Sequence, residues 1–387
     1  MPDLPNPSES SNAPVSLIGP AAVRGPESGL ALCLSGGGYR AMVFHVGALW
    51  RLNEVGFLSR IDRISSVSGG SITAGVLGMN WSGLDFDRAG VAVQFEECVV
   101  APIRRVAGKT IDAWAILGGI LLPWVSIGDR VVANYRRYLF GGKTLQDLPD
   151  APRFVINATN VQSGSLWRFM KPYMRDYRVG EVRNPTILLA TAVAASSAFP
   201  PVLSPVRLKL KSGQFVKNSG TDLQREPFTS RVVLADGGVY DNLGLETAWK
   251  RYQTVLVSDA GAKMEAEARP EADWGRHSLR VLDIIDNQVR SLRKRQLIDS
   301  YRSGERLGAY WGIRTDIANY RLKIVLPCPV ARTSELAAVP TRLARLDQTL
   351  QERLINWGYA VADAAIRAHL DPAIPTPAGF PYPASGV

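Results

Sequence analysis

Three short segments carry residue types that together could perform acyl transfer. Gly36-Gly37-Gly38 follows an apolar run that ends at Leu34, and Ser68 stands in a second glycine-rich turn about thirty residues later. Asp236-Gly237-Gly238 follows another apolar run far downstream. Glycine turns can aim backbone N–H groups at one point and so stabilise a negative oxygen. A serine at a tight corner can create that oxygen by nucleophilic attack on a carbonyl.

Ser68 is the candidate nucleophile because its surroundings match the strained strand-to-helix elbow G-x-S-x-G, with Ser66 in place of the first glycine. Glycines suit such an elbow because a side chain would clash there. Ser65, Ser66 and Ser71 are alternative hydroxyls, and a polar turn in which Ser68 only caps the next helix is the simpler interpretation.

Asp236 is the candidate base, with Asp259 and Asp241 as alternatives. A carboxylate with an ordinary pKa near 4 is a poor base. We therefore expect the base to be buried, or to share a hydrogen bond with the serine that tightens in the transition state.

Gly36, Gly37, Gly38 and Arg40 form the candidate oxyanion hole, with Arg40 either supporting the oxyanion or steadying the loop. The pattern Gly36-x-Gly38-x-x-Ala41 also fits a dinucleotide-binding turn, but that site needs an acid at the end of the second strand. Serines stand there instead, so we expect no nucleotide or nucleic acid as partner.

Strands and helices alternate along most of the chain. Apolar runs predict strands over residues 29–34, 61–67, 153–159, 232–235 and 254–258, and a hairpin over 207–217. Helical patterns cover residues 39–55, 69–79, 188–197, 242–251, 278–303 and 341–370, and residues 82–150 are expected to be mostly helical.

This alternation, with nearly all-apolar strands, predicts an α/β protein: a three-layer α/β/α sandwich with a largely parallel central sheet. Reactive groups gather beyond the carboxyl ends of strands in such sheets. We expect a flexible N-terminal tail (1–28), a catalytic domain (29–260), a C-terminal helical extension packed on it (261–370) and a proline-rich tail (371–387).

Composition is that of a globular protein, with 46% hydrophobic and 21% charged residues among 387. The net charge of +10 favours anionic partners, and the cluster Arg290, Arg293, Lys294 and Arg295 is either a lipid-binding patch or a solvated helix face. Three cysteines show no zinc or redox spacing, so neither metal nor cofactor is expected.

The N-terminus lacks a basic start followed by an apolar run, which predicts no signal peptide and a cytoplasmic location. The apolar stretch 113–125 is too short for a membrane span and suits a buried or interfacial segment. Peripheral association with an anionic membrane is an added hypothesis.

With these residues assembled, the chain resembles the patatin-like phospholipase family (bacterial type) over about residues 29–260. Gly36-Gly37-Gly38-Tyr39-Arg40 is similar to the family's oxyanion motif G-G-G-x-R-G, with Ala41 in place of the last glycine. The Ser68 turn is similar to its nucleophile elbow, and Asp236-Gly237-Gly238 to its D-G-G/A motif. Residues 194–200 (AASSAFP) are similar to its A-S-x-A-x-P segment.

The resemblance implies a three-layer fold, a Ser68–Asp236 dyad and an acyl-enzyme intermediate, without metal or organic cofactor. It also implies a lipid acyl hydrolase that acts on a phospholipid or lysophospholipid. Two alternatives remain: an α/β-hydrolase esterase whose triad adds His277 or His369, and a lipid-binding scaffold whose site has decayed.

Overall fold

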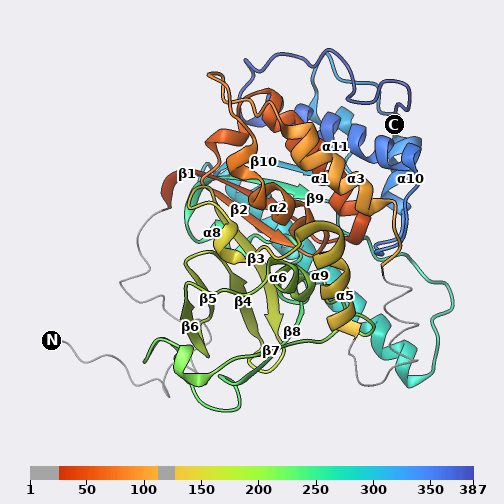
Figure 1. Ribbon diagram of the computed structural model, residues 1–387. Helices are drawn as coiled ribbons and strands as arrows, with labels where there is room; N and C mark the ends of the chain where they lie inside the picture. Colours follow the sequence, from red (N-terminus) through yellow and green to blue (C-terminus); the bar gives the residue numbers. More distant parts are fainter. Residues whose placement is uncertain (1–25, 112–126) are drawn as a thin grey trace.

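The computed structural model describes residues 26–111 and 127–387, which form a mixed α/β fold around one twisted sheet (Figure 1). The apolar stretch 113–125 lies outside the described residues, as does most of the N-terminal segment 1–28. Within the described part of the chain, no helix combines the length and apolar character that a membrane crossing requires.

Ten strands in the described chain make up the sheet. They are β1 (Glu27–Leu34), β2 (Arg63–Val67), β3 (Arg153–Asn160), β4 (Ser165–Phe169), β5 (Tyr173–Asp176), β6 (Gly180–Arg183), β7 (Val206–Lys209), β8 (Arg231–Asp236), β9 (Tyr252–Asp259) and β10 (Leu307–Gly312).

The sheet has a parallel half and an antiparallel half. The strand order is β10-β9-β1-β2-β3-β4-β5-β6, and the five strands from β10 to β3 pair in parallel. From β3 onward β4, β5 and β6 pair antiparallel, and β8 pairs antiparallel with both β3 and β7. The predicted sheet is thus confirmed as largely parallel, with an antiparallel extension that was not predicted.

The helices pack on both faces of this sheet. They are α1 (Gly38–Glu54), α2 (Gly69–Met79), α3 (Ala101–Ala107), α5 (Ile127–Tyr135), α6 (Leu189–Ser196), α7 (Gly238–Asp241), α8 (Glu246–Trp249), α9 (Trp274–Arg302), α10 (Val330–Ala338) and α11 (Gln348–His369). Two π-helical turns adjoin them, at Glu96–Val100 and Arg136–Phe140.

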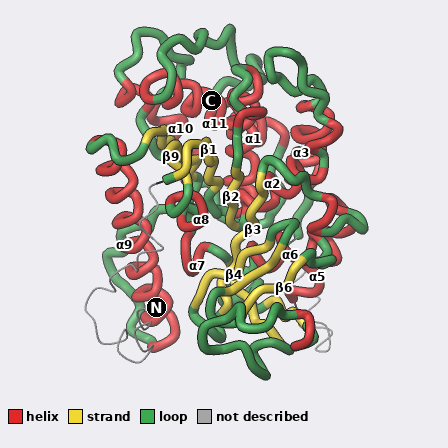
Figure 2. Tube along the Cα trace, turned by 90° about the vertical axis from the view of Figure 1, so that its left-hand side faces the viewer, coloured by secondary structure: helices red, strands yellow, loops and turns green. Residues whose placement is uncertain are grey.

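Strand β1 shows why two layers of helices are needed. Successive side chains of a strand point to opposite faces. Leu32 and Leu34 accordingly lie in the larger core with α1 and α11, whereas Ala31 and Cys33 lie in a smaller core with α8 and Leu297 of α9. Both faces of the sheet are therefore buried, and the three-layer α/β/α fold predicted from the sequence is confirmed (Figures 1 and 2).

Two predicted elements are wrong, and a third, the last helix, is confirmed but starts later than predicted. Residues 207–217 do not form a hairpin, because β7 pairs with the distant β8 and Ser212–Gln214 forms a 3₁₀ turn. The helix predicted over 242–251 is reduced to the short helix α8, and the short helix α7 ends just before this range. The last helix begins at Gln348, after Asp347 caps it by accepting a hydrogen bond from the Leu350 N–H.

The C-terminal third contributes more than helices. It supplies the edge strand β10, which pairs with β9, and α11, which packs along α1. The proline-rich end folds back onto α11, since Asn356 Nδ2 donates to the carbonyls of Tyr382 (2.8 Å) and Gly386 (2.7 Å).

Candidate active site

Strand β3 brings Ser68 and Asp236 together. Val67, the last residue of β2, pairs with Asn157, and Asp236, the last residue of β8, pairs with the next residue of β3, Ala158. Strand β2 runs parallel to β3 and β8 runs antiparallel to it, so the two strands end against each other on the same side of β3. The residue after β2 and the end of β8 therefore meet, although Asp236 does not lie at the carboxyl end of a parallel strand.

The backbone at Ser68 has the strained shape of a nucleophile elbow. Its φ of 51° and ψ of −120° are rare for a residue with a side chain, and such strain persists only where the surroundings enforce it. The Ser68 N–H donates to Ser196 Oγ at 3.0 Å, while Gly70 N donates to the Ser35 carbonyl at 3.2 Å. Gly69 packs directly on the Gly38 carbonyl, which leaves no space for a side chain.

The neighbouring hydroxyls are buried and already engaged. Ser65 Oγ donates to the Gly244 carbonyl at 2.5 Å, and Ser66 Oγ donates to the Val155 carbonyl at 3.2 Å. Ser71 Oγ lies 2.9 Å from Ser196 Oγ. Ser68, in contrast, lines an open cavity, so it is the hydroxyl of this group that a substrate can reach.

Ser196 is a positioning residue to which the sequence analysis assigned no role. Its hydroxyl holds the Ser68 N–H, and its carbonyl accepts from Gly237 N at 3.2 Å. The nearby Ala198 carbonyl accepts from Asp236 N at 2.9 Å. The end of α6 thus connects the serine turn to the aspartate turn, and the segment 194–200 was the sequence signal that could have revealed it.

The glycine loop presents two backbone donors rather than three. Gly37 and Gly38 have φ values of 141° and 58°, which residues with side chains rarely adopt. Among the described residues no acceptor takes their N–H groups, and both glycines line the cavity beside Ser68. Gly36 N donates to the Asn242 carbonyl at 3.0 Å, so the prediction of Gly36 as a third donor is wrong.

Arg40 points away from the cavity. Its Nη1 donates to the carbonyls of Ala337 (2.8 Å) and Val339 (2.7 Å), and its Nη2 donates to the carbonyl of Ala260 (2.8 Å). Burial lowers the pKa of this guanidinium to about 10. Of the two predicted roles, Arg40 therefore has the steadying one, because it ties the start of α1 to the loops around it.

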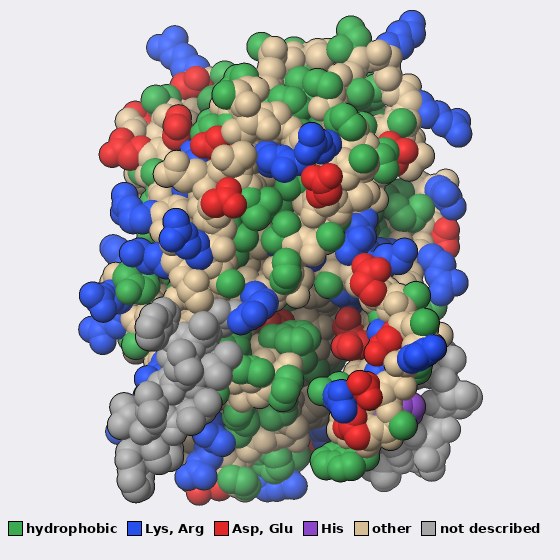
Figure 3. All heavy atoms as spheres, turned by 90° about the vertical axis from the view of Figure 1, so that its right-hand side faces the viewer, with side chains coloured by type: hydrophobic (Ala, Val, Ile, Leu, Met, Phe, Trp, Pro, Cys, Tyr) green, Lys and Arg blue, Asp and Glu red, His purple; other side chains and the backbone are tan. Residues whose placement is uncertain are grey.

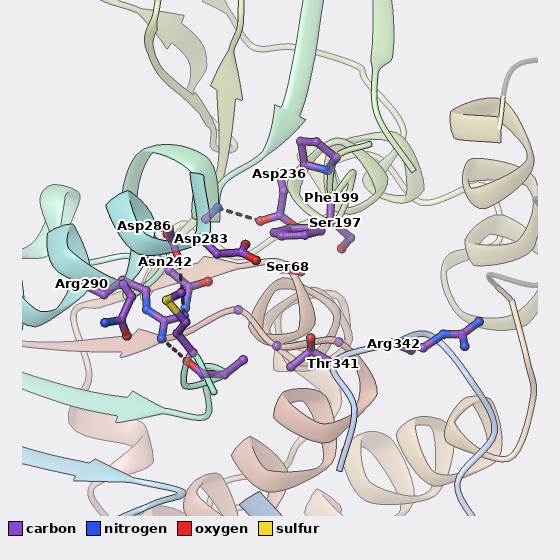
Figure 4. Close-up of a pocket in the computed structure, with 18 of the residues that line it drawn as sticks. Ser68, Ser197, Phe199, Asp236, Asn242, Asp283, Asp286, Arg290, Thr341 and Arg342 are labelled. Carbon is purple, nitrogen blue, oxygen red and sulfur yellow. Dashed lines mark hydrogen bonds and ion pairs between the residues drawn. The ribbon is translucent and has the colours of Figure 1, made fainter. Parts of the chain in front are cut away.

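Asp236 has the properties of a general base. It is fully buried, which raises its pKa to about 7, even though hydrogen bonds from the Gly238 N–H and the Ser68 hydroxyl act to lower it. Gly238 N donates to Oδ1 at 2.7 Å, whereas Oδ2 has no partner in full hydrogen-bonding geometry (Figure 4). A buried carboxylate whose pKa is near neutrality, and which the Ser68 hydroxyl approaches, is suited to accept that hydroxyl's proton.

The two alternative carboxylates are committed elsewhere. Burial alone would raise the pKa of Asp259, but the Lys294 ammonium and hydrogen bonds from Gly261 N and Tyr310 hold it well below its usual range. Asp241 accepts from Leu243 N (3.2 Å) and Glu246 N (2.7 Å). Neither carboxylate lines the cavity that contains Ser68.

The cavity has a volume of about 540 Å³, and its sides differ in polarity. Phe199, Pro200, Val202 and Leu203 form an apolar wall after α6. Figure 4 shows Asp283, Asp286 and Arg290 of α9 on one side of the cavity, with Thr341 and Arg342 on another. Figure 3 shows a hollow on this face where hydrophobic side chains meet acidic ones. The sequence analysis assigned no role in the site to these individual α9 residues, because they follow no known motif.

No histidine in the described chain lines this cavity. His277 is exposed on α9, and the ring of His369 packs against Tyr320. His45 is buried below the glycine loop, where its ring contacts Ser258 Oγ and the Ser35 carbonyl, and burial lowers its pKa to about 4. Across the described residues, no group of three His, Cys, Asp or Glu side chains could hold a metal ion.

The contacts of the basic cluster on α9 show where its side chains lie. Arg290 lies 3.5 Å from Asp286, Arg293 lies 3.4 Å from Glu246, and Lys294 pairs with Asp259. These three side chains therefore point into the protein, and only Arg295 of the four is exposed. The cluster thus presents one cation without a partner among the described residues, Arg295, rather than four.

Comparison with known proteins identifies the family. A three-layer α/β/α fold with a serine at a strand-to-helix elbow defines the class, and the family model for patatin-like phospholipase matches residues 32–249. The chain therefore belongs to the patatin-like phospholipase family. A sequence search among curated proteins gave no match.

Solved structures match this chain at low identity. Human GIVD cytosolic phospholipase A2 in complex with methyl gamma-linolenyl fluorophosphonate is 13% identical, with a TM-score of 0.50 over 87% of this chain and 57% of that one. Another structure of the human protein (13% identity, TM-score 0.39) covers 60% of this chain and 45% of that one. VipD from Legionella pneumophila (13%, TM-score 0.36) covers 89% and 67%. This chain thus spans about half the length of the human phospholipase A2 chains.

Proposed function

We propose that this protein is a lipid acyl hydrolase that cleaves a carboxylic ester of a phospholipid or lysophospholipid with a Ser68–Asp236 dyad. The observation that carries the proposal is the pairing of β2 and β8 with adjacent residues of β3, which sets the elbow serine beside a buried carboxylate of raised pKa. Membership of the patatin-like phospholipase family supports the choice of a lipid as substrate.

The first half-reaction forms an acyl-enzyme. Ser68 Oγ attacks the ester carbonyl carbon while Asp236 takes the hydroxyl proton, and the N–H groups of Gly37 and Gly38 stabilise the resulting oxyanion. The carbon–oxygen bond to the alcohol then breaks, and Asp236 returns its proton to the leaving oxygen. The acyl chain remains esterified to Ser68, with the apolar wall at Phe199–Leu203 beside it.

The second half-reaction releases the fatty acid. Asp236 takes a proton from a water molecule, whose oxygen attacks the acyl carbonyl. The same two N–H groups hold the second oxyanion. Collapse of this intermediate breaks the bond to Ser68 Oγ, which regains the proton, and the free enzyme is restored.

The direct test is to incubate the purified protein with a mixed lipid extract and identify the products by mass spectrometry. We expect free fatty acids together with the matching lysophospholipids or deacylated head groups. The human relative was solved with a fluorophosphonate. A fluorophosphonate probe should therefore also label Ser68 here, whereas a decayed lipid-binding scaffold would take up no label and release no fatty acid.

The rate should follow the ionisation of Asp236. Because the base must be deprotonated to accept the serine proton, kcat/KM rises as pH increases through the raised pKa of about 7 and levels off above it. The check is a pH profile with a water-soluble short-chain ester. A rate that stays constant between pH 5 and pH 8 would contradict a base with this pKa.

A Ser-His-Asp triad makes a different prediction. It needs His277 or His369, and neither lines the Ser68 cavity. We therefore expect His277→Ala and His369→Ala to keep wild-type kcat/KM within about twofold, whereas loss of a triad histidine lowers kcat by several orders of magnitude. Loss of activity in a folded histidine variant would support the triad instead.

A further inference from the structure

Helix α9 turns an apolar surface toward solvent. Trp274 is 88% exposed, and Leu282, Ile285 and Leu292 are 59%, 52% and 54% exposed. With Val281 and Val289, which are also exposed, these residues recur at helical spacing and form one face, the outer stripe. Contiguous apolar surface of this kind marks an interaction site rather than an ordinary solvated face.

The opposite face of the same helix is polar and points into the protein. Asp283, Asp286 and Arg290 line the Ser68 cavity. Arg280 Nη2 donates to the Glu265 carbonyl at 2.7 Å, and Lys294 pairs with Asp259. Polar contacts hold most of α9, and its fully buried side chains are confined to Leu297 and Ser300 near the C-terminal end. The amphipathic helix is thus reversed, with its charged side inward and its apolar side outward.

The position of α9 suits a partner that also enters the cavity. Figure 2 shows the helix along the outside of the molecule. One side of it forms a wall of the cavity, so a partner on the outer stripe lies one helix width from the entrance. An α-helix with its side chains is about 10 Å across, which an acyl chain spans easily.

The charge pattern indicates what that partner is. The outer stripe is interleaved with Ser278, Gln288 and Gln296 and flanked by the exposed Arg295. Its one carboxylate among the described residues, Asp299 beyond Leu292, lies 3.7 Å from Arg302. The acidic side chains Asp283 and Asp286 face the cavity instead. The whole chain carries a net charge of +10. An apolar face with an aromatic end, whose single carboxylate is paired with an arginine, on a basic protein matches an anionic lipid interface.

We propose that the outer stripe of α9 docks on an anionic lipid surface and so sets the entrance of the Ser68 cavity against the lipid. The inference deepens the proposed function and rests on it for the delivery of substrate. Apolar burial provides the attachment, and the basic surface adds attraction to the head groups.

The test is flotation with vesicles of phosphatidylcholine and phosphatidylglycerol. The variant Leu282→Gln/Ile285→Gln/Leu292→Gln keeps size and exposure but removes apolar area from the stripe. We expect its partition onto these vesicles to fall by about 100-fold relative to wild type. The ratio of its activity on vesicles to its activity on a soluble ester should fall by at least about tenfold.

The matched control changes three equally exposed apolar residues elsewhere: Val161→Gln/Ile324→Gln/Val330→Gln, at 51%, 63% and 51% exposure. We expect this control to bind vesicles like wild type. Melting temperatures show whether each variant is folded. If the triple α9 variant is destabilised, the single variant Ile285→Gln takes its place.

Three results would overturn the proposal. The first is no binding of wild type to the vesicles. The second is equal binding of wild type and the α9 variant. The third is a wild-type dimer that the α9 substitutions dissociate, measured by sedimentation, which would assign the stripe to a second copy of the chain. Vesicle binding without hydrolysis of any ester would instead contradict the proposed function and leave the docking surface intact.

Discussion

Replacement of Ser68 by alanine is expected to lower ester hydrolysis by about 10⁴- to 10⁶-fold, because removal of a nucleophile leaves only the oxyanion donors and substrate binding. The fold should persist. Alanine keeps the Ser68 N–H that donates to Ser196 Oγ, and the removed hydroxyl faces the cavity rather than the core. The measurement is kcat/KM on a soluble ester, with the melting temperature recorded in parallel.

The matched control for this variant is Ser230→Ala, which removes an exposed hydroxyl outside the cavity. Its activity and its labelling by a fluorophosphonate should equal those of wild type. A Ser68→Ala protein that still cleaves the ester at the wild-type rate would show that another group is the nucleophile. Ser71 would then be examined first, because it shares the Ser196 hydroxyl with the same turn.

The sequence was informative where chemistry is encoded by neighbouring residues. The glycine loop, the elbow serine and the Asp-Gly-Gly turn each follow a short apolar run, and their local patterns limit the backbone shapes available to them. The buried strands β1, β2 and β9 could be predicted for the same reason, since near-continuous apolar runs suit a parallel sheet covered on both faces.

The direction of the strands and their pairing partners could not be predicted from local sequence patterns. A short buried strand carries no signal for whether it runs parallel or antiparallel, so β8 was recognised as a strand while its reversed direction was not. The edge strand β10 and the strands β4 to β6 have mixed composition, because each contacts the core with only part of its side chains.

The contacts of Gly36 and Arg40 also could not be predicted from the sequence. A motif fixes which residue types stand near the oxyanion but not which N–H groups remain available. Asn242, more than 200 residues away, takes the Gly36 N–H, and the carbonyls of Ala260, Ala337 and Val339 take the Arg40 guanidinium. Such contacts depend on how loops distant in sequence pack together.

Replacement of Asp236 by asparagine is expected to lower ester hydrolysis by about 10⁴-fold, since an amide cannot accept the serine proton. The amide oxygen can still accept from Gly238 N, so the turn should be preserved. The control Asp241→Asn changes an equally buried carboxylate outside the cavity and should retain activity in its folded fraction. Full activity of Asp236→Asn would exclude Asp236 as the base.

The same variant should be more stable than wild type at neutral pH, and the difference should depend on pH. Because the pKa of Asp236 is raised to about 7, the folded protein holds a proton that the unfolded chain releases near pH 4. The unfolding free energy of wild type therefore falls as pH rises between these values. Asparagine does not titrate. The unfolding free energy of Asp236→Asn relative to wild type should therefore increase over this range by up to about 4 kcal/mol. Urea unfolding of both proteins at pH 5 and pH 8 measures this change, and an identical difference at the two pH values would show that burial does not hold the proton on Asp236.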